Sequence, residues 1–381
     1  MAGLLLCGCK SEQQPQQQVQ LGDPLPGLTL EQLAQFQAGR QAFQRVFTPQ
    51  DGLGPLFNGN SCARCHGAPV VGGAGDVIEI HATKFSPQGS CDSLFQEGGP
   101  VIQQHATPLL QAHGITNEPV PPDATGVGRR TSPLLFGLGL VEAIPEVSIL
   151  AQQQTHLVNW IHGHANRTID GRIGRFGHKA GTATLFDFNT GAYHDEMGIT
   201  SALEPVKNTI NGTPVPPDTL LGPEPNISLG EISNTTAFVR FLAPPPPQIF
   251  TDYQDRALAM RGKYLFAALH CAECHVPEMK TGASPINALN DKIVTLYSDL
   301  LVHDLGTNLA DICLQQAAPS QFRTAPLMGL RFREVFLHDG SVTNVQQAIE
   351  LHGGEGLKSA EESKVLRDYD QKALLKFLDS I

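Results

Sequence analysis

Two copies of the pattern Cys-x-x-Cys-His contain the residues in this chain that are best suited to chemistry. They consist of Cys62, Cys65 and His66, and of Cys271, Cys274 and His275. Thiols at this spacing with an adjoining imidazole are typical of haem c attachment, in which two thioether bonds hold the haem and the histidine ligates its iron. The alternative is a zinc site built from the two cysteine pairs. Zinc would leave both histidines as coincidences, so the pattern predicts two covalently bound haems.

The composition fits a folded protein that carries bulky cofactors. The chain has 381 residues, of which 41% are hydrophobic, and this is enough for two globular domains. Aromatic residues make up only 6%, and two haems could supply part of the flat apolar bulk. The formal net charge is -11 without a basic run, which argues against a nucleic-acid partner and is compatible with a basic redox protein as electron donor.

Residues 1–20 resemble a bacterial lipoprotein leader followed by a tether. An apolar run ends in Cys7-Gly8-Cys9, and a Gln-rich stretch follows, so we expect a lipid anchor at Cys9 and a flexible tether behind it. The run is shorter than a usual signal and lacks a positively charged start, and the alternative is a disordered terminus with incidental cysteines. Haem c attachment in bacteria takes place outside the cytoplasm, so both features predict the periplasm or cell envelope.

Two further cysteines, Cys91 and Cys313, belong to neither the haem motifs nor the leader. In an oxidising compartment they could form one disulfide. Each could equally be a small buried apolar side chain. The sequence leaves both possibilities open.

The clearest boundary along the chain is a proline run, Ala243–Pro247, which predicts a stiff extended linker. Apolar residues at helical spacing precede each haem motif, in Leu30–Phe47 and in Asp255–Leu269. A helix followed closely by Cys-x-x-Cys-His is the usual opening of a cytochrome c domain. We therefore expect a mainly α fold of two cytochrome c-like domains, residues 21–248 and 249–381, with long irregular loops and insertions.

Several further motifs make the chain resemble the dihaem oxidoreductase family, which is similar to bacterial dihaem cytochrome c peroxidases and to dihaem enzymes that mature tryptophan-derived cofactors. An Arg-Thr-x-Pro-Leu element follows each haem motif, at Arg130 and at Arg323, which favours duplication. The resemblance covers residues 30–381 and implies that the C-terminal haem stores an electron while the N-terminal haem meets peroxide. The other matching motifs are Gly174–Gly177, Glu196–Thr200, Tyr297–Asp304, Phe336–Gly340 and His352–Glu355.

The resemblance also implies a distal ligand for the C-terminal haem. In the peroxidases an Asp-Gly element and a short helix precede this ligand, which is usually methionine. Here His352 stands at the matching position, after a helical run over Val345–Leu351. Histidine in place of methionine would give bis-histidine coordination and a lower reduction potential. Met328 and His338 are the competing candidates.

In the N-terminal half, the resemblance places Glu196 over the open face of the peroxidatic haem. A carboxyl with a raised pKa can take a proton from bound peroxide and return one to the leaving oxygen. Where the peroxidases have a glutamine partner, this sequence has Phe186-Asp-Phe188. His81 is a candidate sixth ligand of the same haem, on a loop that the glycines of residues 72–75 would make mobile.

Three other features have weaker implications. His303 is expected to hydrogen-bond within the core rather than to ligate iron. The oxygens of Asn166–Asp170 and Asp187 could bind an interdomain Ca2+, as in some relatives, although no loop matches an EF-hand. Trp160, the sole tryptophan, could lie on the electron route between the haems or be ordinary core.

The leading function is therefore an exported dihaem c-type oxidoreductase that resembles peroxidases. Electrons from a small redox protein would pass from the haem on His275 to the haem on His66, which activates peroxide. One alternative is a non-enzymatic electron carrier in which both irons are six-coordinate. Another is an oxidase of a partner protein through high-valent haem.

Overall fold

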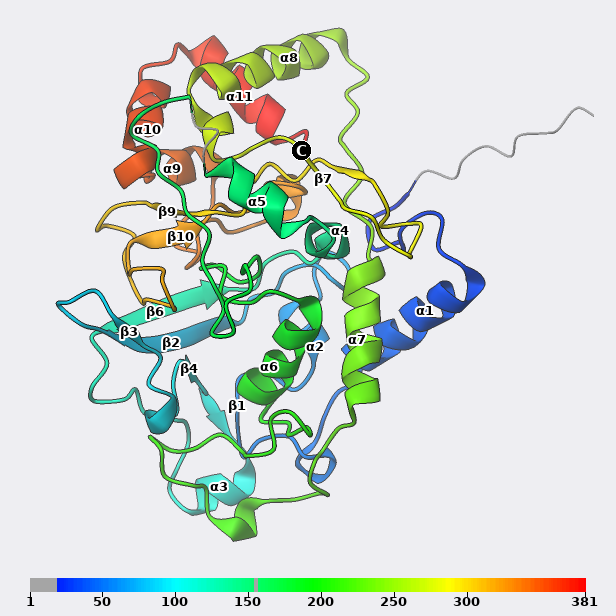
Figure 1. Cartoon of the computed structure of the whole chain (residues 1–381), viewed down its shortest axis with the longest axis vertical. Coiled ribbons are helices and arrows are strands. Elements are labelled where there is room, and N and C mark those ends of the chain that lie inside the picture. Colours follow the sequence, from blue (N-terminus) through cyan, green and yellow to red (C-terminus); the bar gives the residue numbers. More distant parts are fainter. Residues whose placement is uncertain (1–18, 154–156) are drawn as a thin grey trace, which may run out of the picture.

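The computed structural model describes residues 19–153 and 157–381, in which eleven α-helices are joined by short strands and long irregular segments (Figure 1). The helices are α1 (Leu30–Gln44), α2 (Cys62–Cys65), α3 (Pro108–Ala112), α4 (Leu138–Glu142), α5 (Glu146–Gln152), α6 (Leu185–Met197), α7 (Leu229–Phe241), α8 (Tyr253–Ala268), α9 (Val345–Glu350), α10 (Leu357–Lys364) and α11 (Asp368–Leu378). The strands are β1 (Leu56–Phe57), β2 (Ile78–Phe85), β3 (Cys91–Asp92), β4 (Val101–Ile102), β5 (His105–Ala106), β6 (Gly126–Thr131), β7 (Met279–Lys280), β8 (Ile293–Val294), β9 (Val302–Asp304) and β10 (Gln321–Arg323).

Both expected helices before the haem motifs are confirmed, as α1 and α8, and the proline run forms neither helix nor strand. More of the described residues lie in helices than in strands, so the expected mainly α fold is only roughly right. Four small antiparallel sheets accompany the helices in the described residues. The largest is built on β2, which pairs with β6 and also with β3 and β4. Its register places Glu79 opposite Arg130 and His81 opposite Gly128.

Each half of the molecule contains a pair of helices that approach closely at a glycine. In the lower half of Figure 1, α1 packs against α7 at Gly39, where a Cβ atom would lie only 2.1 Å from Asn234 O. In the upper half, α8 packs against α11 at Gly262, where a Cβ atom would lie 1.9 Å from Ala373 O. Any side chain would push these helices apart, so glycine permits both contacts.

The two Arg-Thr-x-Pro elements also occupy equivalent places. Arg130 lies at the end of β6, and Arg323 is the last residue of β10. Each element leads to a left-handed glycine at the start of a short helical turn, Gly137 (φ 75°) in the first half and Gly329 (φ 80°) in the second. A residue with a side chain rarely adopts this backbone conformation. The equivalence supports the internal duplication inferred from the sequence.

The largest hydrophobic core crosses the expected boundary near residue 248. It contains Phe43 of α1 and Phe238 of α7, and also Leu296, Leu300 and Leu301 from beyond the second haem motif. A separate core holds the C-terminal helices around Phe266 and Phe377 (the latter on α11). The division into two domains stays a prediction, because segments of the second half complete the core of the first.

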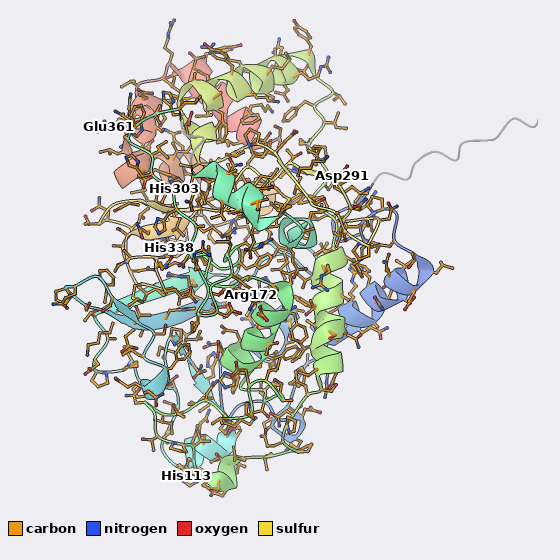
Figure 2. All side chains as sticks on the ribbon, viewed as in Figure 1. His113, Arg172, Asp291, His303, His338 and Glu361 are labelled. Atoms are coloured by element: carbon orange, nitrogen blue, oxygen red, sulfur yellow. A yellow bond between two sulfur atoms is a disulfide. The ribbon has the colours of Figure 1, made fainter. Side chains whose placement is uncertain are left out.

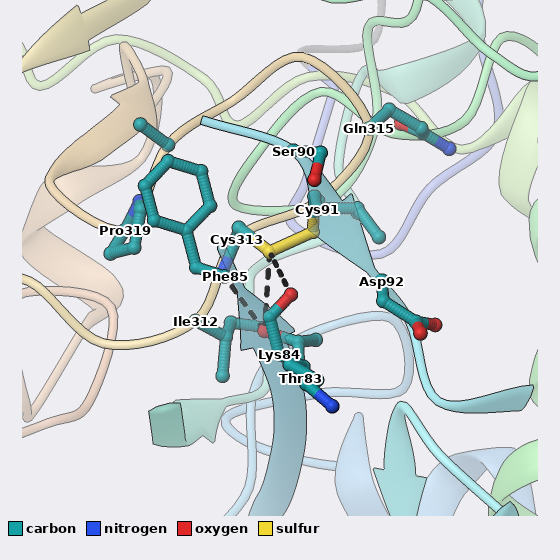
Figure 3. Close-up of a disulfide and its surroundings, with 12 residues drawn as sticks. Thr83, Lys84, Phe85, Ser90, Cys91, Asp92, Ile312, Cys313, Gln315 and Pro319 are labelled. Carbon is teal, nitrogen blue, oxygen red and sulfur yellow. Dashed lines mark hydrogen bonds between the residues drawn. A yellow bond between two sulfur atoms is a disulfide. The ribbon is translucent and has the colours of Figure 1, made fainter. Parts of the chain in front are cut away.

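Cys91 and Cys313 form a disulfide, with their Cα atoms 5.7 Å apart (Figure 3). The bond joins β3 to the segment that precedes β10, and Cys313 N also donates a 3.0 Å hydrogen bond to Thr83 Oγ1 of β2. Of the two possibilities that the sequence left open, the disulfide is therefore the correct one. The expected lipidation site, Cys9, lies outside the described residues. Within those residues, every helix is too short or too polar to cross a membrane.

Candidate functional site

The first Cys-x-x-Cys-His motif forms a single helical turn. The side chain of Ser61 accepts a 3.1 Å hydrogen bond from Arg64 N and so caps the start of α2. The turn brings Cys62 and Cys65 together, and neither is in a disulfide. Burial raises the pKa of both thiols to about 12, so both are neutral thiols.

The imidazole of His66 is held in one orientation by the backbone. Its Nδ1 lies 3.1 Å from Gly73 O and 3.0 Å from Pro133 O, so the ring donates its Nδ1 proton to these carbonyls. Burial lowers the pKa of His66, which favours the neutral ring. A neutral imidazole with its proton on Nδ1 has a free lone pair on Nε2, as a metal ligand requires.

The second motif repeats this arrangement. Cys271 and Cys274 are unpaired thiols at a short 3-10 turn. The Nδ1 of His275 lies 3.0 Å from Tyr297 O, and burial lowers the pKa of His275 to about 4. Here too Nε2 is left for a metal.

The packing behind the two histidines is also the same. The ring of Phe43 lies 6.3 Å from that of His66 with an angle of 55° between the planes, and Phe266 lies 6.3 Å from His275 with the same angle. Each site therefore offers two neutral thiols and one oriented imidazole nitrogen. This donor set fits a haem that is bound through two thioethers and one axial histidine.

His352 is the sequence candidate that lies near His275. It follows α9 as expected, and its Nδ1 lies 2.7 Å from Ala348 O, so its Nε2 is also free of that bond. Burial lowers the pKa of His352. After burial, the charge of protonated His352 is the next cause of the low pKa of His275, so the two side chains lie within electrostatic range of each other. Because both Nδ1 atoms are bonded to backbone carbonyls, the two Nε2 atoms would be available to one metal.

The two competing candidates for this ligand, Met328 and His338, contact other residues. Met328 packs at the edge of the first core, where a Cβ atom on Gly137 would lie 3.0 Å from its Sδ. His338 stacks on Phe322, with ring centroids 4.2 Å apart, and its Nε2 lies 3.3 Å from a carboxylate oxygen of Asp311. Both side chains thus have other partners.

Glu196 lies beside the first thiol pair, in the last turn of α6. Its backbone carbonyl accepts a 3.1 Å hydrogen bond from Gly59 N, and a Cβ atom on Gly59 would lie 3.6 Å from Cys65 Sγ. Burial raises the pKa of Glu196 well above its usual range, and the nearby Glu79 carboxylate raises it further. Burial therefore favours the protonated form of the Glu196 carboxyl.

An amide does accompany this carboxyl, although the sequence motif lacks one. Asn58 Nδ2 donates a 2.9 Å hydrogen bond to Glu196 Oε2, and Asn58 Oδ1 accepts a 2.9 Å hydrogen bond from Gln104 N. Asn58 thus supplies this carboxylate with an amide partner, although the sequence has Phe186-Asp-Phe188 where the peroxidases have a glutamine. Asn58 precedes the first haem motif by only four residues, and that proximity was the one available signal.

His81 lies within β2, so the expectation of a mobile loop is wrong. The glycines of residues 72–75 form a separate, closely packed turn, in which a Cβ atom on Gly73 would lie 1.9 Å from Ala68 O. The Nε2 of His81 lies 3.3 Å from Glu79 Oε2, two residues earlier on the same face of the strand. The charge of Glu79 also raises the pKa of His66 against burial, so this face of β2 borders the first site.

His303 hydrogen-bonds within the core, as expected. Its two ring nitrogens lie 2.8 Å from Asp299 Oδ2 and 2.8 Å from Glu355 Oε2. Burial disfavours the charged ring, but the hydrogen bonds of Asp299, Cys274 and Glu355 outweigh it and raise the pKa of His303 to about 12. Figure 2 shows His303 near β9 and His338 below it.

Two further sequence candidates have other surroundings. Trp160 packs edge-on against His270, at 5.5 Å between ring centroids, and lies under the ammonium group of Lys358 at 3.9 Å. Both of these contacts of Trp160 are with residues of the C-terminal half. Arg172, which is labelled in Figure 2, pairs with Asp170 at 2.7 Å and with Asp187 at 2.9 Å. Calcium binding there stays a prediction.

Comparison with known proteins gives one family. Residues 111–381 match the profile of the family described as "Di-haem oxidoreductase, putative peroxidase". No curated protein matches the sequence.

Solved structures with a similar chain course include three redox proteins. Hydrazine synthase of Kuenenia stuttgartiensis has 13% identity and a TM-score of 0.44, with 100% of each chain covered. The diheme peroxidase BthA of Burkholderia thailandensis E264 has 15% identity and a TM-score of 0.42, with 94% of this chain and 87% of that chain covered. A MauG-like protein associated with microbial copper homeostasis has 16% identity and a TM-score of 0.39, with 97% and 94% covered.

Proposed function

Because the chain belongs to the di-haem oxidoreductase family, we propose that it is an exported, peroxidase-like enzyme with two haems attached through thioethers. The thioethers form at Cys62 and Cys65 and at Cys271 and Cys274. The observation that carries this proposal is an asymmetry between two otherwise equivalent sites. The proximal histidines are held alike, but the first site adjoins a carboxyl with a raised pKa, whereas the second adjoins another imidazole.

The asymmetry assigns different tasks to the two sites. Each bound haem supplies an iron that can change its oxidation state. At the first site, Glu196 accepts a proton from peroxide and returns it to the leaving oxygen, a role that its raised pKa supports. Asn58 holds the carboxylate in place through its 2.9 Å hydrogen bond. At the second site, His352 and His275 would both hold the iron, and a haem held by two histidines would supply storage and transfer of electrons.

Electrons move from the second site to the first in this proposal. The two sites share a seam between the halves that is built from the Arg-Thr-x-Pro elements. Pro133 O accepts the hydrogen bond of His66, and two residues earlier Thr131 N donates a 3.0 Å hydrogen bond to His338 O of the C-terminal half. The seam therefore joins the first site to the C-terminal half through bonded residues, which supports this direction of transfer.

The proposal includes export and a redox partner. The disulfide between Cys91 and Cys313 supports an oxidising compartment, which agrees with periplasmic or cell-envelope location. We propose Cys9 as the site of a lipid anchor, and a small redox protein as the electron donor.

One experiment on the purified, haem-loaded protein tests this function. The half-reduced protein is mixed with CO, and peroxide consumption is then measured with a reduced c-type cytochrome as donor. We expect one haem to bind CO and peroxide to be consumed. A protein that neither binds CO nor consumes peroxide is an electron carrier. Peroxide consumption that oxidises an added protein in preference to the donor would identify a protein oxidase.

A further inference from the structure

The seam between the two halves gathers several basic side chains around one carboxylate. Asp311 is the carboxylate within it, and it bonds to Arg130, to Lys179 at 3.7 Å and to His338 at 3.3 Å. Arg130 and Lys179 are almost fully buried, with 4% and 2% exposure. Buried charges are normally paired. One carboxylate thus already serves three partners, in a chain whose overall charge is -11.

Two more arginines enter the same seam without a carboxylate of their own. The guanidinium of Arg323 donates from Nε to Gly177 O at 2.8 Å, and in the described part of the chain its two Nη atoms have no acceptor. Arg333 donates to Val335 O at 3.2 Å and to Thr131 Oγ1 at 3.4 Å, both neutral acceptors. The nearby Asp299 is bonded to His303.

The electrostatics of His178 agree with this arrangement for Arg130, His338 and Arg323. Burial is the main cause of the low pKa of His178, and the charges of these three residues lower it further. Burial lowers the pKa of Arg323 to about 10 and also lowers that of Arg333. In addition, Arg130 Nη2 is buried without any partner among the described residues.

Arg323 lies beside the second haem motif, whereas Arg333 enters the seam at Thr131. Arg323 adjoins Thr324, whose carbonyl accepts a 2.7 Å hydrogen bond from Ser298 Oγ. The next residue, Asp299, donates from its backbone N to Cys274 O at 2.9 Å. A haem attached at Cys274 therefore has this cationic seam next to it. The ligand missing from the seam must be anionic, and haem carries two carboxylates of its own.

We propose that Arg323 and Arg333 bind the propionate carboxylates of the haem attached at Cys271 and Cys274. Guanidinium forks match carboxylates in geometry and bind them at two points. The propionates would supply the negative charge that the seam lacks, and the two arginines would anchor this haem at its edge while the thioethers anchor it at the vinyl groups. This inference rests on the haem attachment proposed above, but not on the peroxide reaction.

The test measures the reduction potential of each haem by spectroelectrochemistry, at several pH values, in Arg323→Gln and Arg333→Gln. A nearby cation favours the ferrous state, so its loss should shift the ferrous-to-ferric equilibrium of the C-terminal haem about tenfold toward ferric, or about 59 mV. The uncompensated propionate should then take up a proton on reduction. The potential of this haem should therefore become dependent on pH in both variants.

Arg331→Gln is the matched control. Arg331 lies two residues before Arg333, but it donates to Pro246 O and Ile381 O, outside the seam. Both haem potentials of the Arg331→Gln variant should equal those of the unmodified protein. Arg323→Lys and Arg333→Lys keep the positive charge, so the potential of the C-terminal haem should return most of the way to that of the unmodified protein. These two variants also replace a glutamine variant that does not fold.

The outcomes separate the two proposals. Variants that carry two haems, counted as pyridine haemochromes, but keep unchanged potentials at every pH would overturn the propionate site. A change in potential confined to the N-terminal haem would overturn it too. So would a lysine variant whose C-terminal haem has a potential as low as in the glutamine variant. An unmodified protein that contains no haem after maturation would instead contradict the proposed function.

Discussion

Asn58 donates a 2.9 Å hydrogen bond from its side-chain amide to Glu196, across 138 positions of sequence. The backbone strengthens this contact, since Asn58 N and Gly59 N donate to Glu196 O at 2.7 Å and 3.1 Å. The loop before the first haem motif and the end of α6 thus form one unit. Burial raises the pKa of Glu196 and the amide of Asn58 lowers it, so the two residues together set the proton affinity of the pocket.

Replacement of Glu196 tests its role as proton carrier. Glu196→Gln keeps the size of the side chain and its contact with Asn58 but cannot exchange the proton. Because general acid–base groups contribute about 10²–10⁴-fold to rate, we expect peroxide consumption to fall by at least about 10²-fold. Stopped-flow measurement with a reduced c-type donor provides the rate.

Glu231→Gln serves as control for Glu196→Gln. Glu231 lies on α7 and pairs with Arg45 at 2.9 Å near the surface, so its loss should leave the rate unchanged. A Glu196→Gln enzyme as fast as the unmodified one would remove this carboxyl from the mechanism.

Replacement of Asn58 tests how the pocket sets the pKa. Asn58→Leu removes the hydrogen bond that favours the Glu196 carboxylate, so the pKa of Glu196 should rise further. The pH at which the peroxide rate reaches half its maximum should therefore move upward, since the base is the ionised form. The comparison variant is Asn189→Leu, which loses one amide hydrogen bond from the same helix, to Thr236, and should keep the original profile. An unchanged profile in Asn58→Leu would contradict the assignment.

Replacement of His352 tests axial ligation at the second site. His352→Met exchanges an imidazole for a thioether, and because methionine ligation raises the haem potential, we expect the C-terminal potential to increase. Spectroelectrochemistry gives the value. Met328→Leu should leave both potentials unchanged, because Met328 packs against Gly137 in the first core. If Met328→Leu alone altered the C-terminal potential, then Met328 rather than His352 would be the ligand.

Local patterns predicted the helix before each haem motif and the haem-attachment motifs themselves. Both depend on residues that are near in sequence. The helix before the first motif is present as α1, and the one before the second as α8. Patterns do not reveal contacts between distant segments. The sheet around β2 was missed because its main partner β6 is distant in the sequence, and its other partners β3 and β4 have only two residues each. His81 therefore seemed to belong to a loop.

The site shows the same limit. His66 and His275 could be assigned from their motifs, since each adjoins its thiols in the chain. Asn58 could not, because only the fold brings it to Glu196. The sequence also could not identify Arg323 and Arg333 as arginines without a carboxylate partner. A missing partner is recognised only when the spatial neighbours of a charge are known.

The disulfide should contribute strongly to stability. It closes a loop of 222 residues between Cys91 and Cys313, and the chain-entropy relation gives a stabilisation of about 5 kcal/mol for such a loop. The double variant Cys91→Ser, Cys313→Ser should therefore unfold at a clearly lower denaturant concentration. Reduction of the unmodified protein should reproduce that midpoint. Equal midpoints before and after reduction would mean that the bond does not form in solution.

Glu118 should make stability depend on pH in an unusual direction. It is 2% exposed, its Oε1 has no partner among the described residues, and burial raises its pKa to about 8. The folded state thus binds a proton that the unfolded state releases near pH 4.5, so this contribution to stability is full below that pH and is lost as pH rises through about 8. In Glu118→Gln the side chain stays neutral, and its thermal midpoint relative to the unmodified protein should increase from pH 5 to pH 9. A difference that is constant over this range would show that Glu118 ionises normally despite its burial.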